Sequence, residues 1–151
     1  MVLGDEATAD AATAEGRQPA WIQGMALRSE PAMAAGRDQV DPIAGRDCVA
    51  DVYAQAGITD PFKEIDAVEC YVPFSWYEPM WMENLGFAEV GEGWKLTESG
   101  ATGMIRFGEA AMQVRGQAGD HQVHGVRRAL GHAYGGATQF YAMWVVGTGK
   151  P

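Results

Sequence analysis

Three side chains in this sequence can transfer protons: the imidazole of His132 and the phenols of Tyr71 and Tyr134. An imidazole titrates near neutral pH and can act as a base. A phenol can donate a hydrogen bond to a developing oxyanion or alkoxide. Each residue also has a structural explanation, because a histidine in a tight turn can bond to the backbone and a tyrosine can fill space with its hydroxyl satisfied. Residue type alone leaves both alternatives open.

Two glycine-rich turns are candidates for binding a ligand through their backbone. Gly100 and Gly103 bracket the first turn and precede an amphipathic pattern, and at the start of a helix free N–H groups favour an anion or a thioester oxygen. The second turn directly follows Tyr134. On this motif alone, a buried helix with a small-residue N-terminus is the favoured explanation of the first turn. The candidate binding residues are Gly100, Ala101, Thr102, Gly103, Gly135 and Gly136.

The two cysteines and the remaining histidines predict neither a metal site nor an activated thiol. Cys48 and Cys70 lack metal-ligand spacing, and Cys70 lies on an apolar strand with no base beside it. His121 and His124 flank a predicted surface turn, and no third ligand is near them in the sequence. Unpaired cysteines are typical of a reducing cytoplasm, so we expect a cytoplasmic protein without a disulfide framework.

A helix that follows the first glycine-rich turn is expected to position these groups. Its apolar residues recur at helical spacing, and its polar residues lie on the other face. The expected apolar stripe is Met104, Phe107, Ala111 and Val114, broadened by Ile105 and Met112. The expected polar face is Arg106, Glu109, Gln113 and Arg115.

The rest of the pattern alternates strands and helices and predicts an α/β fold. A capping box at Ser75-x-x-Glu78 begins an aromatic-rich helix that ends at Gly86. Trp76, Met80 and Trp81 of that helix are expected in the core or on an exposed apolar face. The other elements expected are helices over 5–16 and 42–57, strands over 21–30 and 65–72, a loop over 87–98, and an edge hairpin of strands 127–133 and 137–146.

Composition limits the class of protein further. A chain of 151 residues is long enough for one domain with a buried core. A net charge of −9 argues against a nucleic-acid partner, since phosphate binding needs basic patches. No apolar run approaches the ~20 residues that a membrane span requires, and no secretory signal is present.

Three segments in the same order resemble thiolases, most closely their lipid-transfer, sterol-carrier-type branch. Gly100–Gly103 with the following helix is similar to the family's Gly-Ala-Thr-Gly segment, and Ala129–Gly136 lies where thiolases carry their last catalytic loop. Ile65–Phe74 resembles the strand and turn that end in the family's Asn-Glu-Ala-Phe motif. The resemblance implies a thiolase-like C-terminal half with a mixed sheet layered with helices over 20–151. Residues 1–19 would be a strand and helix remnant of the N-terminal half.

The sequence departs from thiolases at each catalytic position. Leu96-Thr97-Glu98-Ser99 carries no histidine before Gly100, and Tyr71 and Val72 stand in place of Asn-Glu. His132 occupies the place of the acid/base cysteine, with Tyr134 two residues on. The resemblance implies that the half that contributes the nucleophilic cysteine of thiolases would be missing from this sequence.

The resemblance therefore implies an acyltransferase-family domain that binds or acts on a coenzyme A thioester or lipid ligand and is incomplete alone. Coenzyme A would be the substrate carrier, with no other cofactor. One alternative is part of a thiolase-like aldolase of sterol side-chain breakdown, in which tyrosines replace the thiolase cysteines. Another is a non-catalytic binding module. Expected partners are the missing N-terminal half, an OB-fold and zinc-ribbon protein, or a second copy of the chain in a homo-oligomer.

Overall fold

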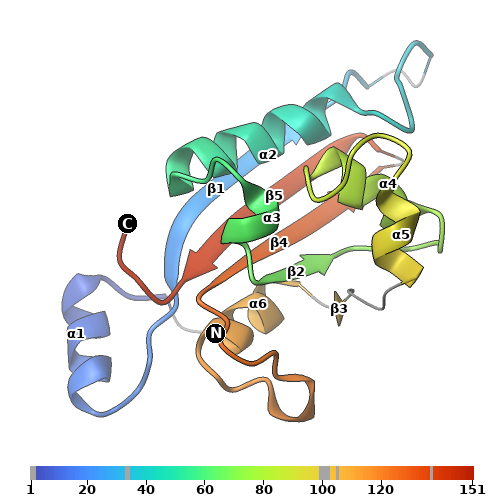
Figure 1. Cartoon of the computed structure of the whole chain (residues 1–151). Helices are drawn as coiled ribbons and strands as arrows, with labels where there is room; N and C mark the ends of the chain where they lie inside the picture. Colours follow the sequence, from blue (N-terminus) through green and yellow to red (C-terminus); the bar gives the residue numbers. More distant parts are fainter. Residues whose placement is uncertain (1–2, 33–34, 99–102, 105, 137) are drawn as a thin grey trace.

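Within the described residues, five strands form one mixed sheet with helices on both of its faces. The computed structural model describes residues 3–32, 35–98, 103–104, 106–136 and 138–151. The strand order is β1-β5-β4-β2-β3 (Figure 1). β1, β5 and β4 pair antiparallel, whereas β4, β2 and β3 pair parallel. The strands are β1 (Trp21–Ser29), β2 (Ala67–Cys70), β3 (Gly103–Met104), β4 (Arg128–Gly135) and β5 (Phe140–Gly147).

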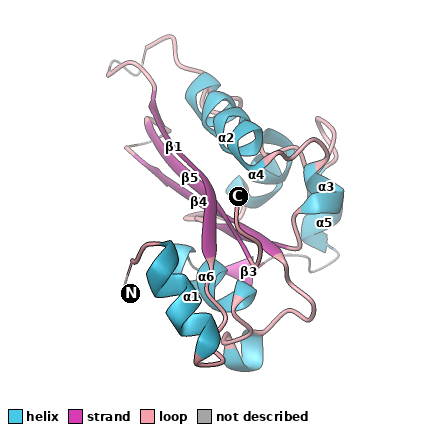
Figure 2. Ribbon diagram, turned by 90° about the vertical axis from the view of Figure 1, so that its left-hand side faces the viewer, coloured by secondary structure: helices cyan, strands magenta, loops and turns pink. Residues whose placement is uncertain are grey.

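Helices lie on both faces of this sheet, as Figure 2 shows from its edge. α2 (Ile43–Ala56) and α4 (Tyr77–Asn84) cover one face, and the larger core cluster forms between them and the sheet, with Val52, Trp81 and Leu130 at its centre. α6 (Arg106–Val114) packs on the other face with Ala110 and Val114. The other helices are α1 (Glu6–Ala14), α3 (Pro61–Glu64), α5 (Gly93–Glu98) and the 3-10 turn η1 (Gly119–His121). The chain is thus an α/β domain with a mixed sheet layered with helices, as predicted.

Local chemistry explains where several elements begin and end. α2 ends at Gly57, which adopts the left-handed conformation (φ 65°) that a helix C-terminus often requires. In β4, a Cβ atom on Gly131 would lie 1.9 Å from Nε1 of Trp144. Only glycine therefore lets this indole lie across the neighbouring strand.

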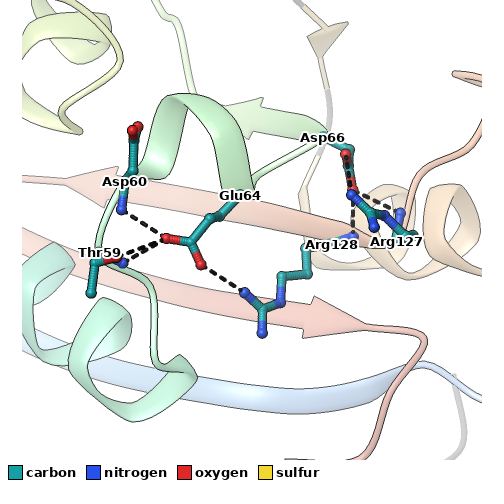
Figure 3. Close-up of polar contacts among 6 residues, drawn as sticks. All are labelled: Thr59, Asp60, Glu64, Asp66, Arg127 and Arg128. Carbon is teal, nitrogen blue, oxygen red and sulfur yellow. Dashed lines mark hydrogen bonds and ion pairs between the residues drawn. The ribbon is translucent and has the colours of Figure 1, made fainter.

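Carboxylates hold together the end of the sheet at which β2 and β4 begin (Figure 3). Asp66 accepts the backbone N–H groups of Arg127 and Arg128 at 2.9 and 3.0 Å, and so sets the position of β4 beside β2. Glu64 accepts the N–H groups of Thr59 and Asp60, both at 2.8 Å, and also contacts the Arg128 guanidinium at 3.3 Å. The N–H of Asp60, followed by that of Thr59, lowers the pKa of Glu64.

Several elements differ from the prediction. The hairpin of β4 and β5 lies inside the sheet and not at its edge, because β1 pairs with β5 and β2 with β4. A short helix, α5, interrupts the expected loop over 87–98. α4 begins at Tyr77 without a side-chain cap, so the expected capping box at Ser75 is wrong. Met80 and Trp81 are buried in the core, and only Trp76 is half exposed.

The helix pattern after the glycine-rich turn is confirmed in part. Val114 is buried as expected, but Met104 belongs to β3, and Ile105 lies outside the described residues. Gln113 is buried while Met112 is exposed, the reverse of the prediction. The Gln113 amide explains this reversal, because it bonds to the His121 carbonyl and the Val123 N–H of the following loop.

None of the helices described here is both long and apolar enough to cross a membrane.

Candidate functional site

Tyr71 and Tyr134 meet at the end of the sheet where the parallel strands β2 and β4 finish. Tyr71 directly follows β2, and Tyr134 is the penultimate residue of β4. The parallel register, with Glu69 beside Gly131, brings these two strand ends together, so that the ring centroids lie 5.7 Å apart. Both side chains are half-buried. The carboxyl ends of parallel strands are where α/β proteins place ligand sites, and the structure brings two of the three predicted proton-transfer residues to this position.

A third tyrosine, which the sequence did not single out, completes the cluster. Tyr77 is the first residue of α4, and its hydroxyl lies 2.9 Å from that of Tyr134, which donates to it. Tyr77 belongs to an aromatic run that, by spacing alone, indicates only core or interface. To identify Tyr77 from the sequence, one would have to know the register of β2 against β4, and no local pattern gives that register.

Stacked rings fix Tyr77. Its ring centroid lies 3.8 Å from that of Trp76, 5.4 Å from that of Trp81 and 5.2 Å from that of Tyr134. The Trp81 indole also donates from Nε1 to the Tyr71 carbonyl at 3.1 Å, and so ties α4 to the end of β2. The hydrogen bond from Trp81 therefore joins the start of α4, which carries Tyr77, to the end of β2, which precedes Tyr71.

The phenol of Tyr134 is neutral at physiological pH. Burial raises its pKa to about 12, and the hydrogen bond to Tyr77 and the nearby phenols of Tyr77 and Tyr71 act in the same direction. A neutral phenol offers a hydrogen-bond donor and not a ready base. The site is therefore suited to stabilising a developing negative charge.

His132 lies within β4 and not in a tight turn, two residues before Tyr134 on the same face. It is fully buried, its ring centroid lies 4.6 Å from that of Trp81, and neither ring nitrogen has a hydrogen-bond partner among the described residues. Burial lowers its pKa to about 3. His132 is thus a neutral ring packed beneath the tyrosines, without access to solvent.

Neither cysteine of this chain offers a thiolate. Burial, the largest cause, raises the pKa of the Cys48 thiol to about 11, and the charge of Asp51 acts in the same direction. Burial raises the pKa of Cys70 further, with Glu69 and Glu78 acting in the same direction. Cys48 donates to the Ala26 carbonyl at 3.4 Å. Both are core residues, as expected for Cys70.

The glycine-rich turns are described only in part. Gly100, Ala101 and Thr102 lie outside the described residues. Gly103 pairs with Glu69 in the β2–β3 ladder and does not start the helix. Gly135 ends β4, and Gly136 turns the chain with φ 63°, close to the Phe140 ring.

A cavity of about 480 Å³ lies where β1 ends and α2 begins, and none of the three clustered tyrosines lines it. Its polar lining includes Arg28, Glu30, Arg37 and Asp47. Burial raises the pKa of Tyr141, and the negative charge of Glu30, which lines this cavity, raises it further. Within the described part of the chain, no three His, Cys, Asp or Glu side chains are grouped so that they could hold a metal ion.

The sequence matches the thiolase C-terminal domain-like family over residues 26–103 and 96–148. The fold resembles a chain of the Ltp2-ChsH2(DUF35) aldolase, with a TM-score of 0.68 and 21% identity over 87% of this chain and 40% of that one. It also resembles a monomeric SCP2-thiolase like protein type 1 (STLP1) from Mycobacterium smegmatis, with a TM-score of 0.53 and 16% identity over 86% of this chain and 29% of that one. No curated protein sequence matches the chain. The chain spans less than half the length of either structural neighbour, and at these identities the likeness shows the fold alone.

Proposed function

Because the chain belongs to the thiolase C-terminal domain-like family, we propose that it forms one part of a site for a coenzyme A thioester in which phenols take the place of a thiolate. The reaction that suits such a site is the cleavage of a β-hydroxyacyl thioester between its α- and β-carbons. This is a retro-aldol reaction, so the proposed enzyme class is a lyase.

One observation carries the proposal: Tyr71 and Tyr134 stand together at the carboxyl ends of β2 and β4, while both cysteines of the chain are buried and protonated. Acyl transfer through a covalent intermediate needs an activated thiol, whereas a retro-aldol reaction needs only proton transfer and charge stabilisation. The similarity of fold to part of an aldolase supports the same choice.

The protons and electrons of this reaction balance without a further reactant. The β-hydroxyl gives its proton to a base of a second polypeptide segment or chain as its carbon becomes a carbonyl, and the bond between the α- and β-carbons breaks. The bonding electrons form a thioester enolate, whose negative oxygen needs hydrogen-bond donors. The Tyr134 hydroxyl donates to Tyr77 in this structure and would turn toward the enolate to supply one donor. Tyr71, with its ring centroid 5.7 Å away, is the second candidate. The enolate then takes a proton at the α-carbon.

The rest of the site would come from another polypeptide segment or chain. A thiolase-like N-terminal half or an OB-fold and zinc-ribbon partner fits this role, and the aldolase with the similar fold carries two protein names, Ltp2 and ChsH2. If the added half carries a reactive thiol, the alternative is acyl transfer. In that case this chain would contribute the oxyanion-binding side of the thioester site.

Replacement of Tyr134 by phenylalanine, in a complex reconstituted with the partner, tests the proposal. With a β-hydroxyacyl-CoA as the probe, the Tyr134→Phe variant should release aldehyde or ketone roughly a hundredfold more slowly. Its free energy of unfolding should change by no more than ~1 kcal/mol, a single hydrogen bond. The control is Tyr53→Phe, which removes a different phenol, one bonded to the Leu85 carbonyl at 2.7 Å, and should keep the full rate.

Two other results would contradict the lyase assignment. An unchanged lyase rate in Tyr134→Phe would leave that residue as packing. Acyl label held on a partner cysteine, together with thiolysis by free coenzyme A, would establish acyl transfer instead.

A further inference from the structure

We propose that Tyr77 is the positioning residue of this site: its hydroxyl fixes the direction of the Tyr134 phenol and controls when that phenol holds its proton. The role in turnover rests on the proposed function, but the coupling between the two phenols does not. Sequence patterns give no reason to select Tyr77.

The contact between the two hydroxyls is the first support. At 2.9 Å the distance is that of a normal O–H···O hydrogen bond. Tyr77 is only 5% exposed, whereas Tyr134 is half-buried. A substrate would therefore touch Tyr134, with Tyr77 standing behind it.

The rigidity of the Tyr77 ring is the second support. Trp76 and Trp81 stack on it, and its backbone N–H donates to the Phe74 carbonyl at 3.0 Å. The Tyr77 hydroxyl cannot turn away from Tyr134 without breaking these stacks. Packing of this kind keeps a functional group in place between turnovers.

The electrostatic consequence has a definite sign. The hydrogen bond that Tyr134 donates to Tyr77 favours the protonated form of Tyr134. Loss of the Tyr77 hydroxyl should therefore lower the pKa of Tyr134, although burial, the largest cause of the raised value, would remain.

Fluorine NMR gives a test that needs no substrate. Difluorotyrosine placed at position 134 titrates at a lower pH than tyrosine, and its pKa can be measured in the folded chain. We expect a lower pKa at position 134 in the Tyr77→Phe background and no change in the Tyr53→Phe background. Tyr77→Phe keeps the stacked ring, and its thermal unfolding midpoint shows whether it folds. An unchanged pKa at position 134 in folded Tyr77→Phe would overturn the proposal.

Kinetics of the reconstituted complex separate this proposal from the one on which it rests. Tyr77→Phe should lower kcat roughly fivefold to tenfold, as expected for one hydrogen bond, with KM unchanged and the alkaline limb of the rate profile moved to lower pH. If the wild-type complex shows no lyase activity, the proposed function fails, and the NMR result alone decides whether the phenols are coupled. If the complex is active but Tyr77→Phe has wild-type rates and pH profile, the positioning role is wrong while the lyase assignment stands.

Discussion

The imidazole of His132 packs against the indole of Trp81 with 4.6 Å between ring centroids, and neither of its nitrogens has a hydrogen-bond partner among the described residues. A buried polar group without a partner costs stability, and its charged form would cost far more. This is why burial lowers the pKa of His132 to about 3, against an ordinary value of 6.5.

Acid should therefore destabilise the fold through His132. Between pH 6.5 and 3 the unfolded chain binds a proton at this residue and the folded chain does not, so this contribution to stability falls as the pH falls. His132→Phe keeps a stacked ring, removes the two unpartnered nitrogens and should flatten this part of the profile. Urea unfolding at several pH values measures the slope. A wild-type slope in His132→Phe would show that the imidazole is protonated in the folded chain.

Glu69 should act in the opposite direction. Its side chain is buried in β2, and burial followed by repulsion from Glu109 raises its pKa from 4.5 to about 7. The folded state then binds more protons than the unfolded state, so the stability that Glu69 contributes is complete below pH 4.5 and lost as the pH rises through 7. Glu69→Gln should be more stable than wild type by about 1–2 kcal/mol at about pH 8.

Removing Glu109 provides the matched experiment for Glu69. Glu109→Gln relieves the repulsion but keeps Glu69 buried, so the loss of stability should move to lower pH without disappearing. Denaturant unfolding at about pH 5 and about pH 8 distinguishes the two variants. Equal losses of stability between these pH values in wild type and Glu69→Gln would mean that this carboxyl does not titrate in the range.

The Asp66 carboxylate should matter more for stability than any exposed ion pair nearby. It accepts two backbone N–H groups at the start of β4 (Figure 3), and its removal leaves both donors without that acceptor. We expect Asp66→Ala to lower the free energy of unfolding by about 1–3 kcal/mol. Lys63→Ala, which removes an exposed pair with Asp60, is the control and should have little effect. Equal effects from the two variants in urea unfolding would contradict this account.

Most helices and strands can be predicted from the sequence, because the signals for them lie within a few neighbouring residues. An imperfect alternation of apolar residues indicates β1, a nearly continuous apolar run indicates β2, and Gly57 marks the end of α2. The same signals fail where strand pairing decides the outcome. Nothing in residues 127–147 says that β1 pairs with β5, so the sequence wrongly predicts the hairpin at an edge of the sheet.

The site is predictable in part for the same reason. Tyr71 and Tyr134 are identified by their places in the thiolase resemblance, and the parallel register of β2 and β4 then brings them together. Tyr77 could not be selected, because its contact with Tyr134 joins residues 57 positions apart. The burial of Gln113 could not be predicted either, because it depends on hydrogen bonds between its amide and the loop that follows α6.

One face of the sheet carries exposed apolar side chains. Leu27, Met25 and Phe140 are 74%, 57% and 54% exposed. Ladder pairing places them on the face opposite α2, because Met25 is paired with Trp144 and Leu27 with Ala142. α6, on the same side in Figure 2, packs on β2, β4 and β5. Among the described residues this face therefore carries an exposed apolar surface, whereas Met80 and Trp81 of the face predicted at Trp76, Met80 and Trp81 are buried.

Such a surface promotes association, so the chain by itself should self-associate as its concentration rises. Sedimentation velocity should show this for wild type, and the double variant Met25→Lys with Leu27→Lys should shift the distribution toward monomer. Val90→Lys, at an exposed position in a turn, is the control and should behave as wild type. A wild-type chain that stays monomeric at high concentration would rule out this face as an association surface between copies.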